Sequence, residues 1–369
     1  LLANVCSGIM KTRTNVWDGD FGMRITFNQI VDALESLDQQ QKQLLLRILS
    51  ETNESQNPAP ATLTNLDEIR SSRFYAGLKC PYCGGSENIK KNGKTKRGQQ
   101  RYFHHDCNRS FSDLTFTPIY RTKYPQKWAM YLQAMEQGLP IRKCAFLVGI
   151  SVPTAFHWRH KILHALSEMK SQKLKGIVEA DETFFLHSEK GKRNLQRKAR
   201  KRGGVASKRG ISKEQVCVLV ARDRTKQTIA EVAKFGQLSA AALDRLLAQR
   251  LESGAILCTD EEKTFRKFAS DHKLQHEQVC PKKKRYVTKE IYHIQNVNAY
   301  HERLKTFIDR FRGVATKYLN HYIAYHLFLD STRSVDELTR TRELFLQALR
   351  QPMRTTGKDL SQYCEARMV

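Results

Sequence analysis

Three cysteines and one histidine stand in two pairs that share a two-residue gap. The stretch CPYCGG supplies the first pair and RYFHHDCNRSF the second, and the four residues are Cys80, Cys83, His104 and Cys107. Thiolates and imidazoles at this spacing are the usual ligands of a tetrahedral zinc ion. The basic stretch between the pairs is typical of a hairpin, so we predict a zinc ribbon over residues 73–118 with a structural Zn²⁺. His105 could replace His104, but His104 keeps the two-residue gap to Cys107.

Two aspartates fall on segments whose pattern predicts strands. Asp181 interrupts the apolar run GIVEADETFF, and Asp260 ends AILCTD. A buried strand seldom carries an unpaired carboxylate, because desolvating the charge is costly, and a divalent cation between two such acids removes this cost. Two salt-bridged acids near a sheet edge are the alternative. From Gly176 onward, the apolar pattern predicts the order β-β-β-α-β-α-β-α, which is that of an α/β RNase H-like mixed sheet with flanking helices.

An amide and an amine lie two turns apart in the long helix predicted from about Tyr292 to Phe311. Asn298 and Lys305 are seven residues apart, which places them on one helical face. An amide oxygen can bind a hard cation, and a lysine can hold a phosphate. The simpler interpretation is that Asn298 is only a polar surface residue.

Residues 119–172 carry the turn signals of three short helices. Gly138–Pro140 and Gly149–Ser151 separate the apolar patterns, and Ser151 is a good N-cap for the third helix. This layout predicts a helix-turn-helix DNA-binding domain, although other helical hairpins share it. The polar side chains of the third helix that remain for DNA are Thr154, His157, Arg159, His160 and Lys161.

The charge balance indicates a polyanionic partner. The chain has 369 residues with 63 Lys and Arg against 37 Asp and Glu, and its formal net charge is +26. Nucleic acid is the default partner for such an excess. A basic insertion is predicted at 188–212, and a second basic run spans Lys282–Arg285; we expect both to contact DNA. The basic residues of the insertion are Lys190, Lys192, Arg193, Arg197, Lys198, Arg200, Lys201, Arg202, Lys208 and Arg209.

The remaining segments organise the chain. We predict an unstructured flank at 1–22, a helical arm and linker at 23–72, and a C-terminal helical tail at 331–369. There is no apolar run of the ~18 residues that a membrane span needs and no signal-peptide layout, so we expect a soluble, cytoplasmic protein. The other six cysteines suit core packing; they are Cys6, Cys144, Cys217, Cys258, Cys280 and Cys364.

The chain from about Lys79 to Leu329 resembles bacterial insertion-sequence transposases of the ISXO2-like family, in the DDE-type superfamily. The stretches that carry the resemblance are CPYCGG, GIVEADETFF, ILCTD, HIQNVNAYHERLK and RFRGVATKYL. The resemblance implies a subgroup in which asparagine replaces the third carboxylate of related enzymes. It also implies Mg²⁺ or Mn²⁺ bound by the first three members of the catalytic set, which is Asp181, Asp260, Asn298 and Lys305.

Two positions depart from the pattern of that family. His104 stands where a cysteine is more usual, and it preserves a suitable zinc ligand. After Asp260 the chain reads EEK in place of a small turn, so Glu261 and Glu262 could either crowd the metal or face solvent.

We therefore expect a DNA transposase that binds the ends of its insertion sequence and catalyses metal-dependent DNA strand cleavage and strand transfer. Its catalytic domain would span residues 173–330, and a homo-oligomer would assemble on transposon ends and target DNA in the bacterial nucleoid. The alternative from another class is a DNA-binding regulator or an inactive transposase copy. A broken Asp181 or Asp260 would favour that alternative, and both residues are present. A structure-specific nuclease on the same fold is a third possibility.

Overall fold

The structure is a computed structural model of the whole chain. Its contacts divide the chain into Leu1–Pro60 and Ala61–Val369, and the second unit contains every element discussed below. The predicted flank at 1–22 and most of the predicted arm at 23–72 lie outside the described residues. The described residues are 37–39, 41–43, 65–169, 172–195, 197–200, 203–280, 283, 286–311 and 313–350.

A small antiparallel sheet follows the helix α4 (Leu66–Arg73). Its strands pair in the order β1 (Ile89–Lys94), β2 (Gln100–His104) and β3 (Arg109–Ser112). The core of this sheet is little more than a stacked pair of rings, Tyr102 and Phe111, whose centroids are 5.1 Å apart beside the buried Cys80. So small a cluster buries little apolar surface, and further covalent or metal bonds are needed to hold such a unit together.

Three helices occupy the segment in which the sequence places them: α5 (Trp128–Glu136), α6 (Ile141–Val148) and α7 (Val152–Ser167). Gly149 ends α6 in the left-handed conformation at φ 62°, which glycine adopts without steric cost. The side chain of Ser151 then caps α7 by accepting a hydrogen bond from the Thr154 N–H. Trp128 and Trp158 stack at 4.3 Å between the first and third of these helices.

The second sheet is mixed and has five strands in the order β6-β5-β4-β7-β8. The first three in sequence, β4 (Ile177–Leu186), β5 (Gln215–Asp223) and β6 (Thr228–Phe235), are antiparallel neighbours, whereas β7 (Ile256–Thr259) runs parallel to β4 and β8 (Gln275–Gln278) parallel to β7. The helices α8 (Ala240–Leu247) and α9 (Lys263–Asp271) connect the later strands. This order and polarity are consistent with the predicted RNase H-like arrangement.

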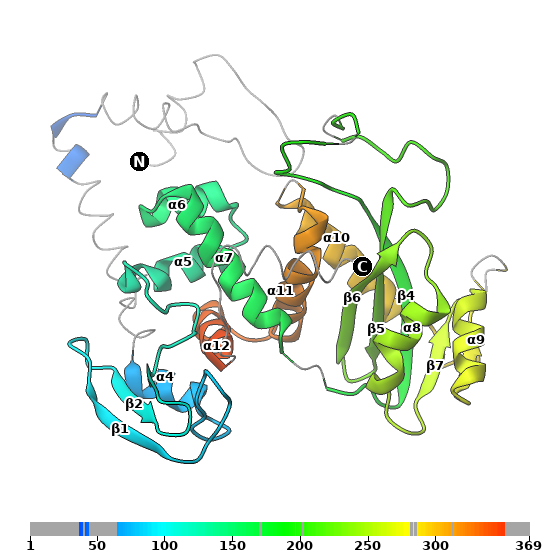
Figure 1. Cartoon of the computed structure of the whole chain (residues 1–369). Coiled ribbons are helices and arrows are strands. Elements are labelled where there is room, and N and C mark those ends of the chain that lie inside the picture. The colour runs from blue at the N-terminus through cyan, green and yellow to red at the C-terminus, as the bar shows by residue number, and fades with distance from the viewer. Residues whose placement is uncertain are drawn as a thin grey trace. The chain divides into compact units, whose positions relative to one another are not determined.

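Alternate residues of β5 belong to two different cores, because successive side chains of a strand point to opposite faces. Val216, Val218 and Val220 join the cluster that includes α10 (Gln295–Asp309) and α11 (Leu319–Ser331), whereas Cys217 and Leu219 join the cluster that includes α8 and α9. Figure 1 shows the sheet between these two sets of helices. The helices therefore cover both faces of the sheet.

The first of these clusters also contains the three-helix segment. Tyr131 of α5 and Ile162 of α7 belong to the same buried cluster as Tyr325 of α11, and the Tyr325 hydroxyl donates to the Met135 carbonyl. The last described helix, α12 (Glu337–Arg350), contributes Leu344 and Phe345 to the same cluster. The boundary predicted at residue 172 therefore does not separate two hydrophobic cores. Over the residues that the structure describes, no helix combines the length and the apolar character that crossing a bilayer requires.

Candidate active site and metal centre

Asp181 lies on β4, and Asp260 directly follows the neighbouring strand β7. The parallel pairing of β4 with β7 aligns Val178 with Leu257 and Glu179 with Cys258. The same register, continued by two residues, sets Asp181 opposite Asp260 just where β7 ends. Two carboxylates are thus brought to one point of the sheet from segments almost eighty residues apart.

Repulsion and burial both act on the Asp181 carboxyl. Its side chain is 19% exposed, and Oδ1 accepts a hydrogen bond from the Glu182 N–H at 2.9 Å. Burial and the charge of Asp260 raise the pKa of Asp181 to about 7, against the opposing effects of that hydrogen bond and of Lys305. A carboxyl whose ionisation is opposed in this way is suited to bind a cation, since the cation would stabilise the charged form.

The helix α10 presents one polar face that includes both residues expected from the sequence. Asn298 and Lys305 are exposed on α10, two turns apart, and Lys305 acts electrostatically on Asp181. The helix packs against β4 and β5. The structure therefore brings Lys305 close enough to act on the charge of Asp181 and sets Asn298 on the same face of the same helix.

A third side chain on this face was missed by the sequence reasoning. His301 lies one turn after Asn298 and one turn before Lys305; its Nδ1 is 3.8 Å from Oδ2 of Asp181. The residue is 7% exposed, and Nε2 has no hydrogen-bond partner among the described residues. Burial and the charge of Lys305 lower the pKa of His301 to about 4. Its position between the two expected residues, at helical spacing from both, is the signal that could have found it.

The glutamates near Asp260 are engaged with other groups. Glu261 accepts a hydrogen bond from the Cys280 thiol at 2.9 Å, and Glu262 accepts from Gln237 and Thr264 at 3.3 Å each. Only the backbone N–H of Glu262 contacts Asp260, at 3.0 Å from Oδ1. Both glutamates thus have side-chain partners other than Asp260, while the charge of Glu262 still acts on Glu182, beside Asp181.

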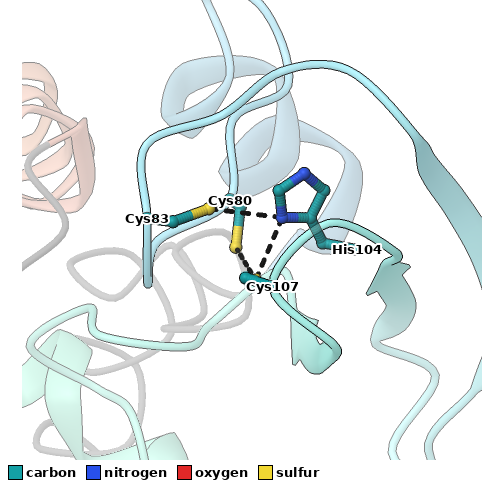
Figure 2. Close-up of side chains that lie close together, drawn as sticks. All are labelled: Cys80, Cys83, His104 and Cys107. Atoms are coloured by element: carbon teal, nitrogen blue, oxygen red, sulfur yellow. Dashed lines mark hydrogen bonds between the residues drawn. The ribbon is translucent and has the colours of Figure 1, made fainter.

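The three cysteines and the histidine of the first motif converge at one end of the small sheet (Figure 2). Sγ of Cys83 and Sγ of Cys107 lie 3.2 Å and 3.0 Å from Nδ1 of His104, and the sulfurs of Cys80 and Cys107 are 3.6 Å apart. All four ligand atoms lie within 4.8 Å of one another. A tetrahedral zinc ion with bonds of ~2.0 to 2.3 Å would separate its ligands by about 3.3 to 3.8 Å. The donor set and its spacing therefore fit zinc, with Nδ1 of His104 as the nitrogen ligand.

The surroundings of this cluster support the same ligand arrangement. A Cβ added to Gly85 would meet Cε1 of His104 at 3.1 Å, so the glycine lets the backbone wrap closely around the ring. A carboxylate oxygen of Asp106 lies 3.3 Å from Nε2 of His104, on the side of the ring opposite the sulfurs, without the geometry of a hydrogen bond. The Gly85 N–H lowers the pKa of Cys83, whereas burial and the neighbouring cysteines raise the pKa of Cys107 to about 11. A cation would favour the thiolate form of both.

The third helix of the three-helix segment keeps only part of its expected DNA surface. His157 is exposed and Thr154 partly exposed, but Arg159 and His160 are 1% and 2% exposed. One guanidinium nitrogen of Arg159 donates to the Leu139 carbonyl at 2.7 Å. The expectation that Arg159 and His160 face DNA is therefore corrected, because α7 is covered by α6 on one side and by α11 on another. Lys161 is half-buried and donates to the Pro118 carbonyl at 3.3 Å.

The basic insertion lines a cavity of about 430 Å³. Arg200 lies between the His187 carbonyl, to which it donates, and Glu214, whose Oε1 is 3.6 Å away. Arg193 and Lys198 are exposed, whereas Lys201 and Arg202 lie outside the described residues, as does most of Lys282–Arg285. The residues that line the cavity are His187, Arg197, Arg200, Lys208, Ser212, Lys213 and Glu214.

Comparisons with known proteins fit this arrangement of sites. Residues 173–328 match the family model of the ISXO2-like transposase domain. An uncharacterized protein in transposable element ISH50 of Halobacterium salinarum is 26% identical over 255 residues, which cover 68% of this chain and 84% of that protein. A crystal structure of a pre-cleavage Mos1 transpososome matches at 13% identity over 59% of this chain and 77% of the other, with a TM-score of 0.18, which is too low to support a shared fold. Residues 173–328 are thus similar to the ISXO2-like transposase domain, and about two thirds of the chain is similar to a protein in a transposable element.

Proposed function

We propose that this protein is a transposase that binds the ends of its insertion sequence and catalyses metal-dependent DNA strand cleavage and strand transfer. The observation that supports the proposal is the register of β4 and β7, which, continued by two residues, aligns Asp181 with Asp260, whose charge acts on Asp181. Asp181 on β4 and Asp260 at the end of β7 supply carboxylate oxygens for a metal ion. Asn298 and Lys305 share one face of α10, which packs against β4, and they add an amide oxygen and a cation that can bind phosphate.

Each residue of the set has a role that its chemistry supports. Asp181 and Asp260 would hold Mg²⁺ or Mn²⁺, and Asn298 would add a neutral oxygen ligand. The metal would supply activation of water and of a freed 3′-hydroxyl for in-line displacement at phosphorus. Lys305 would hold the DNA phosphate at the site. Because an amide replaces a third carboxylate, the protein part of the site carries less negative charge, and we expect the DNA phosphate to contribute more to metal binding.

DNA binding outside the active site would use the elements before and within the transposase domain. The small sheet with its Cys3His cluster would be a zinc ribbon, and α5 to α7 a helix-turn-helix unit that presents Thr154 and His157. The basic insertion would contact the DNA backbone through exposed cations such as Arg193 and Lys198. We further propose that the protein acts in the bacterial cytoplasm as a homo-oligomer that brings transposon ends and target DNA together.

The experiment that tests this function compares two residues of one helix. Glu302 follows Asn298 by one turn and is the acid on α10 that could serve as a conventional third ligand. We expect Asn298→Ala, Asp181→Ala and Asp260→Ala each to lose Mg²⁺-dependent cleavage and joining of a DNA fragment that bears the element's end, by at least about a hundredfold. Glu302→Ala is the matched control and should keep most of the activity.

Each variant is first shown to bind the DNA fragment as the wild type does. Loss of activity in Glu302→Ala with retention in Asn298→Ala would assign the third ligand to the glutamate. Retention in all four variants would make the acids structural and would leave a DNA-binding regulator, or an inactive copy, as the better interpretation.

A further inference from the structure

The helix that bears Asn298 begins without a side-chain cap from its own N-cap residue. The residue at the N-cap position of α10 is Ile294, whose side chain cannot accept a hydrogen bond. The first N–H groups of a helix have no partner within the helix, so they need an acceptor from elsewhere. Nδ1 of His293 accepts from the Gln295 N–H at 3.3 Å, and the acceptor for the next two N–H groups comes from a strand more than a hundred residues earlier in the chain.

That acceptor is the carboxylate of Glu179 on β4. Its Oε2 accepts hydrogen bonds from the N–H groups of Asn296 at 2.8 Å and Val297 at 3.1 Å, and its Oε1 accepts from Nδ2 of Asn296 at 2.6 Å. The side chain of Glu179 is 0% exposed. A buried carboxylate at the positive end of a helix dipole is a strong cap, because each of its bonds is charge-assisted.

The charge of Glu179 is balanced from the opposite side. A guanidinium nitrogen of Arg224, in the turn between β5 and β6, lies 3.0 Å from Oε1, and Nδ1 of His293 lies 3.5 Å from the same oxygen. Arg224 also donates to the Ile291 carbonyl at 2.8 Å, just before α10. The network therefore joins three segments: β4, the β5–β6 turn and the entry to α10.

The position of this network relates it directly to the proposed site. Glu179 precedes Asp181 by two residues on β4, so both side chains point to the face of the sheet that α10 covers. The N–H groups that Glu179 accepts belong to the two residues immediately before Asn298. The Glu179 carboxylate thus holds the start of α10, which carries Asn298, against β4, which carries Asp181.

We propose that Glu179 is a positioning residue that sets Asn298 and Lys305 against Asp181, with Arg224 as its charge partner. This inference rests on the proposed function, which it deepens by naming what holds the metal ligands in place. Such outer partners commonly change metal affinity by ~10 to 100-fold when they are removed.

The test uses Glu179→Gln, which keeps the shape of the side chain but removes its charge and replaces one of its two acceptor oxygens by an N–H₂ group, so that in either orientation the amide N–H₂ meets a hydrogen-bond donor. Glu136→Gln is the matched control, because Glu136 is another buried glutamate, paired with Arg340 away from this helix start. In protein that is free of Mg²⁺ and Mn²⁺ but keeps its zinc, we expect hydrogen exchange at the first turns of α10 to accelerate at least tenfold in Glu179→Gln. The exchange should stay unchanged in Glu136→Gln. Equal exchange in the two variants would overturn the positioning role, whatever the protein does with metal.

The second measurement is Mn²⁺ binding, followed by electron paramagnetic resonance of the free ion. We expect the half-saturating Mn²⁺ concentration to rise about tenfold in Glu179→Gln and about threefold in Arg224→Gln, with wild-type binding in Glu136→Gln. Arg224→Gln keeps the hydrogen bonds from the start of α10 to Glu179 and removes only their charge partner. It therefore provides the test if Glu179→Gln folds poorly. Wild-type Mn²⁺ binding in both Glu179→Gln and Arg224→Gln would overturn the positioning role of Glu179. Wild-type Mn²⁺ binding in Asp181→Asn would instead overturn the proposed metal site.

Discussion

Oδ2 of Asp181 lies 3.8 Å from Nδ1 of His301, and the surroundings of each group oppose its ionisation. Burial and Asp260 raise the pKa of the carboxyl to about 7, and burial and Lys305 lower the pKa of the imidazole to about 4. Around neutral pH the imidazole is therefore uncharged and the carboxyl is only partly ionised. A cation that enters the site displaces a proton from Asp181, and this gives binding a defined dependence on pH.

We expect Mn²⁺ affinity to fall about tenfold for each pH unit below about 7 and to level off above it, because one proton must leave Asp181 when the ion binds. Titration calorimetry between pH 5.5 and 8.5 measures this dependence. Asp181→Asn should abolish it along with most of the binding. A flat affinity from pH 5.5 to 7.5 would show that Asp181 is already ionised in the metal-free protein.

The same shift predicts that Asp181 destabilises the metal-free fold at neutral pH. An unfolded aspartate has a pKa of about 4, so the stabilisation given by protonated Asp181 is complete below about pH 4. It is lost as the pH rises through the folded value of about 7. At pH 8, after a discount for partial solvation, Asp181→Asn should raise the free energy of unfolding by about 1 to 2 kcal/mol.

Urea unfolding in Mg²⁺-free buffer without chelator measures that gain while leaving zinc in place. Asp244→Asn, on an exposed aspartate paired with His272, is the control and should change stability by less than about 0.5 kcal/mol. An Asp181→Asn variant less stable than the wild type at pH 8 would contradict the expected sign.

Zinc should be required for the small sheet of β1 to β3. Wild-type protein should carry about one zinc per chain, and Cys83→Ser should lose it together with the protection of this sheet from proteolysis, since a core of two rings and one thiol is too small to fold alone. Metal analysis measures the zinc. Cys280→Ser, at a buried thiol that donates to Glu261, should retain it. Stoichiometric zinc in Cys83→Ser would remove that residue from the ligand set.

Binding of DNA by the basic insertion should be visible in the salt dependence of affinity. Lys208→Gln with Lys213→Gln removes two cations from the rim of the cavity. We expect the slope of log affinity against log salt to fall by about 0.9 for each phosphate that is no longer neutralised, or about 2 in all. The control pair is Lys267→Gln with Lys273→Gln, at exposed lysines in and after α9. Equal slopes for the two double variants would mean that the cavity does not face the DNA backbone.

Local pattern predicted the elements well, but not the contacts between them. The apolar run GIVEADETFF located the strand of Asp181, and the seven-residue spacing placed Asn298 and Lys305 on one helical face, because both signals lie in one short stretch of sequence. The role of Glu179 was missed, since its hydrogen-bond partners lie at Asn296 and Val297, beyond the reach of any periodicity.

The assignment of Arg159 failed for the same kind of reason. A single helical sequence shows which residues are polar, but it does not show that a second helix from much later in the chain will cover part of that polar surface. Here α11 packs against α7, and the guanidinium of Arg159 lies over the ring of Phe311, with the two 5.5 Å apart. Arginine satisfies both constraints, because its long apolar stem packs while its nitrogens reach a carbonyl.

Arg159 and His157 should therefore respond in opposite ways to truncation. Arg159→Ala leaves a cavity between helices and removes the stronger of the two donors to the Leu139 carbonyl, the other being the Cys144 thiol at 3.4 Å, so we expect a loss of about 2 to 4 kcal/mol in the free energy of unfolding. DNA affinity, corrected for the folded fraction, should change by less than about twofold. His157→Ala, at an exposed position one helical turn after Thr154, should leave stability within about 0.5 kcal/mol of the wild type and weaken DNA binding. Urea unfolding and fluorescence anisotropy on the element's end separate the two effects. If Arg159→Ala were fully stable but defective in binding, the side chain would have to leave the core to reach DNA, and α7 would pack differently against α11 in the DNA-bound protein.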